Sequence, residues 1–389
     1  MDSAYWERIQ VLFHEAADRP ASQREAFLKS SCGDDPALIA DVLAMLEEDL
    51  RGQSVLDRSI AQVASHVLGE TDSSSALREF GPYRVIRLLG EGGMGIVYLA
   101  ERKDLGSLVA IKVLRDSWLS PARRERFASE QRTLAQLNHP SIARLYDADA
   151  LPDGTPWFVM EYVEGVPLTD YCDQHQSSIE QRLHLFRAVC EAVQYAHGNA
   201  VIHRDLKPSN ILVKSDGTIR LLDFGIAKQL ESLDTPINQT MTGLRLMTPA
   251  YAAPEQIRGD RVGVHTDVYS LGVILFELLA GQLPFDLTNL TPAEAATIIT
   301  EHEPGRPSSI SKLKNAVPGI SSVSKIAWSD LDVLCLTAMH KDHERRYRSV
   351  EALIRDVDHY LAGEPLEARP DSYATGWGNL SGVMTELLR

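Results

Sequence analysis

His203-Arg204-Asp205-Leu206-Lys207-Pro208-Ser209-Asn210 is the stretch that decides how this chain is interpreted. It brings a carboxylate, an ammonium group and an amide onto one short loop. A carboxylate can accept a hydroxyl proton, an ammonium group neutralises phosphate charge, and an amide oxygen can ligate a metal ion. The stretch therefore predicts a phosphoryl-transfer site if the remaining parts of such a site lie at fitting distances along the chain.

A glycine-rich segment lies upstream, and after Leu89 it reads Gly90-Glu91-Gly92-Gly93-Met94-Gly95-Ile96-Val97. Glycines let the backbone approach phosphate oxygens closely and offer N–H groups to them. The same spacing occurs in dinucleotide-binding folds, where a helix follows the glycines directly. Here Ile96-Val97-Tyr98-Leu99 continues as a predicted strand, so the pattern favours a hairpin that covers phosphates.

Lys112 ends Val109-Ala110-Ile111-Lys112, a predicted strand beneath that hairpin. A lysine on an apolar strand is costly to bury alone, so phosphate oxygens and a carboxylate are expected beside it. Glu130 is the favoured carboxylate, because it shares a helical stripe with Phe127 and Leu134. Glu125 is the alternative.

Asp223-Phe224-Gly225 begins thirteen residues after Asn210, and the strand-like run 219–222 leads into it. Magnesium binds oxygen ligands and typically takes one or two protein carboxylates together with substrate phosphates. Asn210 and Asp223 are therefore the predicted metal ligands.

Two further acidic residues have predicted partners. Glu255 closes Ala253-Pro254-Glu255, where it is either an ordinary surface carboxylate or the partner of a downstream arginine such as Arg346, which would fix the end of the segment. Asp267 heads an apolar helix, where two roles stay open: it caps backbone N–H groups only, or it also braces the loop that carries Asp205.

Composition limits the class of protein. The chain has 389 residues, a formal net charge of −15 and 44% hydrophobic residues. The negative charge argues against a general nucleic-acid binder, which needs a basic face. No basic and apolar leader opens the chain, and no apolar run is long enough for a membrane span. The four cysteines are far apart and predict reduced thiols in a cytoplasmic protein.

The periodicity of apolar residues divides the chain. We expect a helical N-terminal module at 1–70, a polar linker at 71–80, a main domain at 81–362 and a tail at 363–389 that contains an amphipathic helix. The main domain starts with predicted strands at 83–89, 95–100, 108–113, 144–149 and 157–162, and it is mainly helical after residue 179. An α+β fold with a β-rich lobe followed by a helical lobe is predicted.

With these motifs in order, the chain from about Tyr83 to Leu361 resembles a bacterial eukaryotic-type (Hanks-type) serine/threonine protein kinase. The resemblance implies the bilobal protein-kinase fold and the use of ATP and Mg²⁺. It implies that Asp205 accepts the substrate proton and that Lys207 stabilises the transferring phosphoryl group. Lys112, supported by Glu130, would bind the nucleotide phosphates.

The resemblance also implies further nucleotide contacts and a mode of regulation. Met160 matches the gatekeeper, and Glu161-Tyr162-Val163 matches the adenine-binding hinge. Lys207, within Asp-Leu-Lys-Pro, goes with Ser/Thr acceptors on protein substrates. Autophosphorylation is expected at Thr240 or Thr242, where the added charge would pair with Arg204.

Alternatives to an active signalling kinase remain. A pseudokinase scaffold that binds nucleotide or partners is disfavoured by intact Lys112, Asp205, Asn210 and Asp223. A small-molecule phosphotransferase is disfavoured by the long segment that ends at Glu255. The N-terminal helices are either an interaction or autoinhibitory module or a stabilising appendage, and they or the C-terminal helix are candidates for self-association. Members of this family often continue into a membrane span, and none is present in this sequence.

Overall fold

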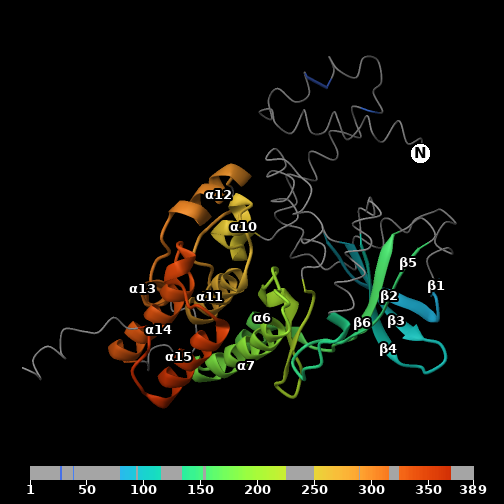
Figure 1. The fold of residues 1–389 in the computed structure, drawn as a ribbon, viewed down its shortest axis with the longest axis horizontal. Coiled ribbons are helices and arrows are strands. Elements are labelled where there is room, and N and C mark those ends of the chain that lie inside the picture. The colour runs from blue at the N-terminus through green and yellow to red at the C-terminus, as the bar shows by residue number, and fades with distance from the viewer. Residues whose placement is uncertain are drawn as a thin grey trace, which may run out of the picture. The chain divides into compact units, whose positions relative to one another are not determined.

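The computed structural model describes residues 27, 28, 38, 79–92, 95–114, 134–151, 155–224, 249–288, 290–314 and 324–368. The chain divides into two compact units, residues 1–76 and 77–389. The fold given below is that of the second unit (Figure 1).

A twisted sheet opens this unit, and its strands follow the spatial order β1-β2-β3-β4-β6-β5 (Figure 1). All neighbouring strands in it are antiparallel. One core cluster of the sheet is built around Phe80, Tyr83 and Trp157, whose rings pack at 5.4 to 6.3 Å between centroids. The five predicted strands are confirmed by β2 to β6. The prediction of a linker at 71–80 is wrong at its end, because residues 79–80 form β1 and Phe80 is buried in the core. The strands are β1 (Glu79–Phe80), β2 (Tyr83–Gly92), β3 (Gly95–Arg102), β4 (Leu108–Leu114), β5 (Leu145–Ala150) and β6 (Pro156–Glu161).

The rest of the unit is mainly helical and encloses the largest apolar core. Helix α11 runs through this core, and nearly all of its residues are buried. A Cβ on Gly272 of α11 would lie 2.8 Å from that of Ala338 in α14, so glycine permits this close helix contact. The helices are α6 (Leu168–Gln174), α7 (Ile179–Gly198), α10 (Pro254–Arg258), α11 (Val264–Ala280), α12 (Pro292–Glu301), α13 (Pro307–Lys314), α14 (Lys325–Ala338) and α15 (Val350–Ala362).

Local sequence sets several helix ends. Ser178 and Gln181 form a capping box at the start of α7, and Thr291 and Glu294 form one at the start of α12. Gly281 ends α11 with φ of +69°, a left-handed conformation that glycine adopts without steric cost.

A small second sheet joins the β-rich and helical parts. Its strands β7 (Val166–Pro167), β8 (Ile211–Val213) and β9 (Ile219–Leu221) are antiparallel. Leu221 of β9 also bridges the segment before β5, because its N–H donates to Ser141 O at 2.8 Å and its carbonyl accepts from Ala143 N at 3.0 Å. Short 3₁₀ turns lie at Pro208–Asn210, Pro249–Tyr251 and His343–Arg345.

The residues after α15 pack onto that helix. The buried carboxylate of Asp356 accepts hydrogen bonds from Glu367 N at 2.6 Å, Ala368 N at 3.0 Å and Tyr347 Oη at 2.9 Å. Leu366 is buried in the main core. The first six residues of the predicted tail, 363–368, are therefore attached to the helical part.

Several sequence predictions fall outside the described residues. These are most of the N-terminal helical module and linker, the helix with Glu125 and Glu130, the segment with Thr240 and Thr242, and the C-terminal amphipathic helix. Within the described part of the chain, no helix is both long and apolar enough to cross a membrane.

Candidate active site

Asp205 lies in the loop between α7 and the 3₁₀ turn at Pro208–Asn210, and it is 8% exposed. Lys207 Nζ lies 3.3 Å from Asp205 Oδ2. Asn210 Nδ2 donates to the same oxygen at 3.1 Å and to the Asp205 carbonyl at 2.9 Å. The carboxylate, the ammonium group and the amide that the sequence predicted for this site therefore come together.

The side chain of Asp267 braces this loop through hydrogen bonds to its backbone. Its fully buried carboxylate accepts hydrogen bonds from the backbone N–H groups of His203 and Arg204, both at 2.8 Å, and from His197 Nε2 at 2.7 Å. Burial alone would raise the pKa of Asp267, but these donors outweigh it, and the pKa is lowered. Of the two roles left open by the sequence, Asp267 performs the bracing one.

His203 holds the next turn of the loop. Its Nε2 lies 2.9 Å from the carbonyl of Leu222, which can only accept, so Nε2 carries the proton. Nδ1 then accepts the N–H of Asp205 at 3.3 Å. Burial lowers the pKa of His203, which favours this neutral form. The imidazole also packs on the ring of Phe224, with 4.6 Å between centroids.

Two site residues other than glycine have left-handed backbone conformations. Arg204 has φ of +65° and Asp223 has φ of +49°. Such a conformation costs about 1–2 kcal/mol for a residue with a Cβ atom. The surrounding hydrogen bonds must hold both positions, and strain of this kind is concentrated at functional sites.

Asp223 contacts the predicted phosphate-binding lysine. Lys112 Nζ, on β4, donates to Asp223 Oδ2 at 2.9 Å, and both side chains are largely buried. Because of this ion pair, Lys112 is not left as an unpaired charge on an apolar strand. Glu130 lies outside the described residues, so its pairing with Lys112 stays a prediction.

The predicted metal ligands are brought together by the backbone. Leu222 N donates to Asn210 O at 2.8 Å, so Asn210 and Asp223 lie on adjacent segments. The Asn210 amide uses its nitrogen for Asp205 and keeps its oxygen as an acceptor, and the Asp223 carboxylate comes from the adjacent segment. This donor set fits Mg²⁺, which prefers few protein oxygens together with substrate phosphates. No group of three or more His, Cys, Asp or Glu residues suited to a metal occurs in the described ranges.

The glycine-rich segment forms the predicted hairpin. Gly92 pairs with Gly95 at its tip and Gly90 pairs with Val97 further down, so the segment continues as a strand and is not followed by a helix. A Cβ atom on Gly95, where φ is +148°, would lie 2.1 Å from Val113 O of β4. Gly95 therefore allows the hairpin to lie against the strand that carries Lys112. Gly93 and Met94 lie outside the described residues.

Met160 and Glu161 are at the end of β6, and Val163 follows closely. Glu161 Oε1 accepts a hydrogen bond from Arg220 Nε at 3.2 Å, which connects the end of β6 to β9. Met160, Lys112 and Asp223 line one cavity. The rest of its lining is apolar and consists of Leu114, Leu134, Leu137, Ile142, Ala143, Leu145, Phe158 and Phe224.

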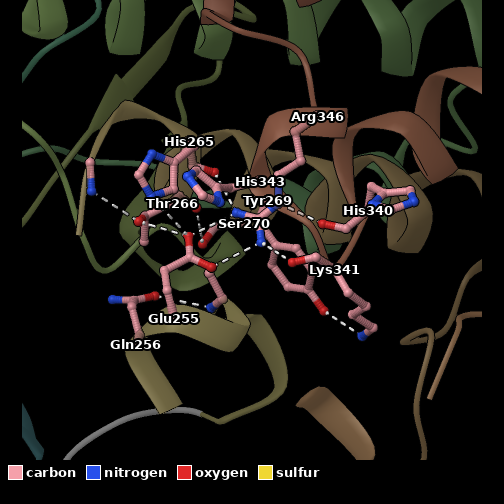
Figure 2. Close-up of polar contacts among 12 residues, drawn as sticks. Glu255, Gln256, His265, Thr266, Tyr269, Ser270, His340, Lys341, His343 and Arg346 are labelled. Atoms are coloured by element: carbon pink, nitrogen blue, oxygen red, sulfur yellow. Dashed lines mark hydrogen bonds and ion pairs between the residues drawn. The ribbon is translucent and has the colours of Figure 1, made fainter. Parts of the chain in front are cut away.

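Figure 2 shows the anchor of helix α10, which follows the predicted regulatory segment. Arg346 donates to both carboxylate oxygens of Glu255, at 2.7 and 2.9 Å, and both side chains are buried. Burial would raise the pKa of Glu255, but the guanidinium outweighs burial and lowers it. The predicted Glu255–Arg346 pair is confirmed.

Sequence reasoning missed two contacts near this anchor. Tyr251 Oη donates to Glu277 Oε2 at 2.6 Å, and burial raises the pKa of both groups. Gln256 Nε2 donates to the carbonyl of Arg204 at 2.9 Å. Neither contact belongs to a motif, and the second joins a side chain to a backbone atom, for which a single sequence carries no signal.

A site with this geometry belongs to the class of phosphotransferases. The hairpin lies against the strand that carries Lys112, the predicted phosphate contact, and Lys112 bonds to Asp223, whereas Asp205, the predicted proton acceptor, contacts Lys207 and Asn210.

Comparison with known proteins identifies the family. The family model described as "Protein kinase domain" matches residues 83–356, so the chain belongs to the protein kinase family. The chain is 35% identical over 319 residues to the serine/threonine-protein kinase PknB of Mycobacterium tuberculosis, which covers 79% of this chain and 48% of that protein. It is 37% identical over 279 residues to the serine/threonine-protein kinase Pkn1 of Myxococcus xanthus, with coverages of 70% and 37%.

A solved structure agrees with this assignment. The kinase domain of PknI from Mycobacterium tuberculosis has a TM-score of 0.53 and 27% sequence identity, with coverages of 73% of this chain and 97% of that domain. The predicted fold, a β-rich lobe followed by a helical lobe, is therefore confirmed for the kinase domain. The chain spans less than half the length of the two curated relatives.

Proposed function

We propose that this protein is an ATP- and Mg²⁺-dependent serine/threonine kinase that phosphorylates proteins in bacterial signalling. The proposal rests above all on the environment of Asp205, whose carboxylate contacts Lys207 and Asn210 in a loop braced by Asp267. The names of the bacterial relatives support the choice of Ser and Thr as acceptors. The cytoplasm, where ATP is available, is the proposed compartment.

Each residue has one task in this proposal. Asp205 orients the acceptor hydroxyl and takes its proton, and Lys207 offsets negative charge on the transferring group. Lys112 and the hairpin hold the nucleotide phosphates. Asn210 and Asp223 hold Mg²⁺, which neutralises charge on the phosphates. Met160, Glu161 and Val163 flank the base.

The test is phosphoryl transfer from radiolabelled ATP with Mg²⁺, measured for the wild type and for Asp205→Asn. The substitution keeps the size of the side chain and removes the proton acceptor, so we expect incorporation to fall by about 10²-fold or more. Phosphoamino acid analysis should show phosphoserine or phosphothreonine. Equal incorporation by both proteins would contradict catalysis by Asp205, and no incorporation by either protein would favour a scaffold.

We further propose autophosphorylation at Thr240 or Thr242. A phosphate there adds nearly two negative charges, which suit pairing with a guanidinium such as that of Arg204. Mass spectrometry of active protein should find phosphate on one of the two threonines. Active protein with both threonines unmodified would contradict this part of the proposal.

A further inference from the structure

The backbone that leads into Asp205 is held at an unfavourable conformation. Arg204, the preceding residue, is left-handed although it has a Cβ atom. Relaxation of its φ angle would rotate the peptide group between Arg204 and Asp205 and change the direction of the Asp205 side chain. The orientation of the proposed proton acceptor therefore depends on whatever fixes this peptide group.

Both polar atoms of that peptide group have side-chain partners. Its N–H, from Asp205, donates to His203 Nδ1 at 3.3 Å. Its carbonyl, from Arg204, accepts from Gln256 Nε2 at 2.9 Å. The peptide group one step earlier is held by Asp267, through the N–H of Arg204. Gln256 is the one of these partners that comes from α10.

Gln256 is itself held firmly. Its Oε1 accepts the N–H of Ala253 at 3.0 Å, so one amide serves as donor and acceptor at once. Reversing the amide would place oxygen against the Arg204 carbonyl and NH₂ against an N–H, so the network fixes its orientation. The adjacent Glu255 is bound by Arg346 in the anchor of α10 (Figure 2).

We propose that Gln256 is a positioning residue for catalysis. It transmits the position of α10, at the end of the predicted regulatory segment, to the peptide group that aims the Asp205 carboxylate. The effect is on the chemical step, because Gln256 contacts the loop through the Arg204 carbonyl, whereas Lys112, the proposed phosphate contact, bonds to Asp223. This inference rests on the proposed kinase activity.

Gln256→Glu is the most direct test. A carboxylate at this position can still accept the N–H of Ala253, but it has no hydrogen to donate and opposes the Arg204 carbonyl. We expect kcat to fall about 10-fold, with KM for ATP close to that of the wild type and the melting temperature lowered by only a few degrees. Gln174→Glu, the same change at an exposed position of α6, is the matched control and should leave kcat unchanged.

The number of nucleotide-binding sites, compared with kcat, distinguishes a positioning role of Gln256 from a purely structural one. A purely structural role would reduce the number of nucleotide-binding sites, measured with a fluorescent ATP analogue, in proportion to the loss of activity. A kcat equal to that of the wild type, or a loss that follows the number of nucleotide-binding sites, would overturn the inference and leave the kinase assignment intact. A wild type as inactive as Asp205→Asn would instead refute the proposed function.

Discussion

Removing Arg346 should destabilise the kinase domain, and the size of the effect should depend on pH. The Arg346 side chain is 0% exposed and makes five hydrogen bonds: two to Glu255 and one each to the carbonyls of His265, His340 and Lys341. Arg346→Met keeps much of the volume and leaves the Glu255 carboxylate buried without its counter-charge. Breaking one side of such a pair costs about 3–5 kcal/mol.

Protonation of Glu255 limits this cost. An isolated buried carboxylate takes up a proton when protonation costs less free energy than burial of the charged form. From an unfolded-state pKa of 4.5, protonation costs roughly 3.4 kcal/mol at pH 7 and roughly 0.7 kcal/mol at pH 5, since each pH unit corresponds to about 1.4 kcal/mol. In the variant the folded-state pKa is raised, so its stability falls as pH rises. The deficit relative to wild type should therefore shrink by roughly 2–3 kcal/mol between pH 7 and pH 5.

Urea unfolding followed by circular dichroism at the two pH values measures this deficit. Arg346→Met combined with Glu255→Gln removes the charge and should show a deficit that does not vary with pH. Arg84→Met breaks an exposed pair with Glu101 and should cost less than about 1 kcal/mol. A deficit of Arg346→Met that is equal at pH 5 and pH 7, or below about 1 kcal/mol, would refute the reasoning.

Three further predictions concern other parts of the domain. Burial lowers the pKa of His203 from 6.5, so its contribution to stability is complete above pH 6.5 and is lost as pH falls below it; a ring titration by NMR with a midpoint at or above 6.5 would contradict this. Gly95→Ala should destabilise the hairpin by about 1–3 kcal/mol in thermal unfolding, and an effect no larger than that of Gly90→Ala, whose Cβ meets nothing within 4 Å, would contradict the steric argument. A chain that ends at residue 362 should melt well below one that ends at 368, because Asp356 loses two N–H donors; equal melting temperatures would show that these bonds contribute nothing.

The sequence was sufficient where a pattern is local or a motif fixes the chemistry. Alternating apolar residues predicted five of the six strands of the first sheet, because one face of each strand packs into the core. The motif around Asp205 predicted which side chains meet there, and Lys207 and Asn210 are within 3.3 Å of it. The Glu255–Arg346 pair was also predicted, since a downstream arginine can fix the end of the segment that Glu255 closes.

Contacts between distant side chains and backbone atoms could not be predicted in this way. Gln256 binds a carbonyl 52 positions away, and every residue has a carbonyl. The sequence left the role of Asp267 open because capping and bracing use the same carboxylate. Only the packing of α11 beneath the loop decides between them.

The bridge between Leu221 and residues 141–143 joins β9 to the segment before β5, two residues before Asp223, a separation of at most about 7 Å. If the first sheet rotated by about 10° about this bridge, Asp223 would be displaced by only about 1 Å, whereas atoms farther along the sheet would travel proportionally farther. Rotation about this bridge would therefore leave the predicted metal ligand Asp223 almost stationary.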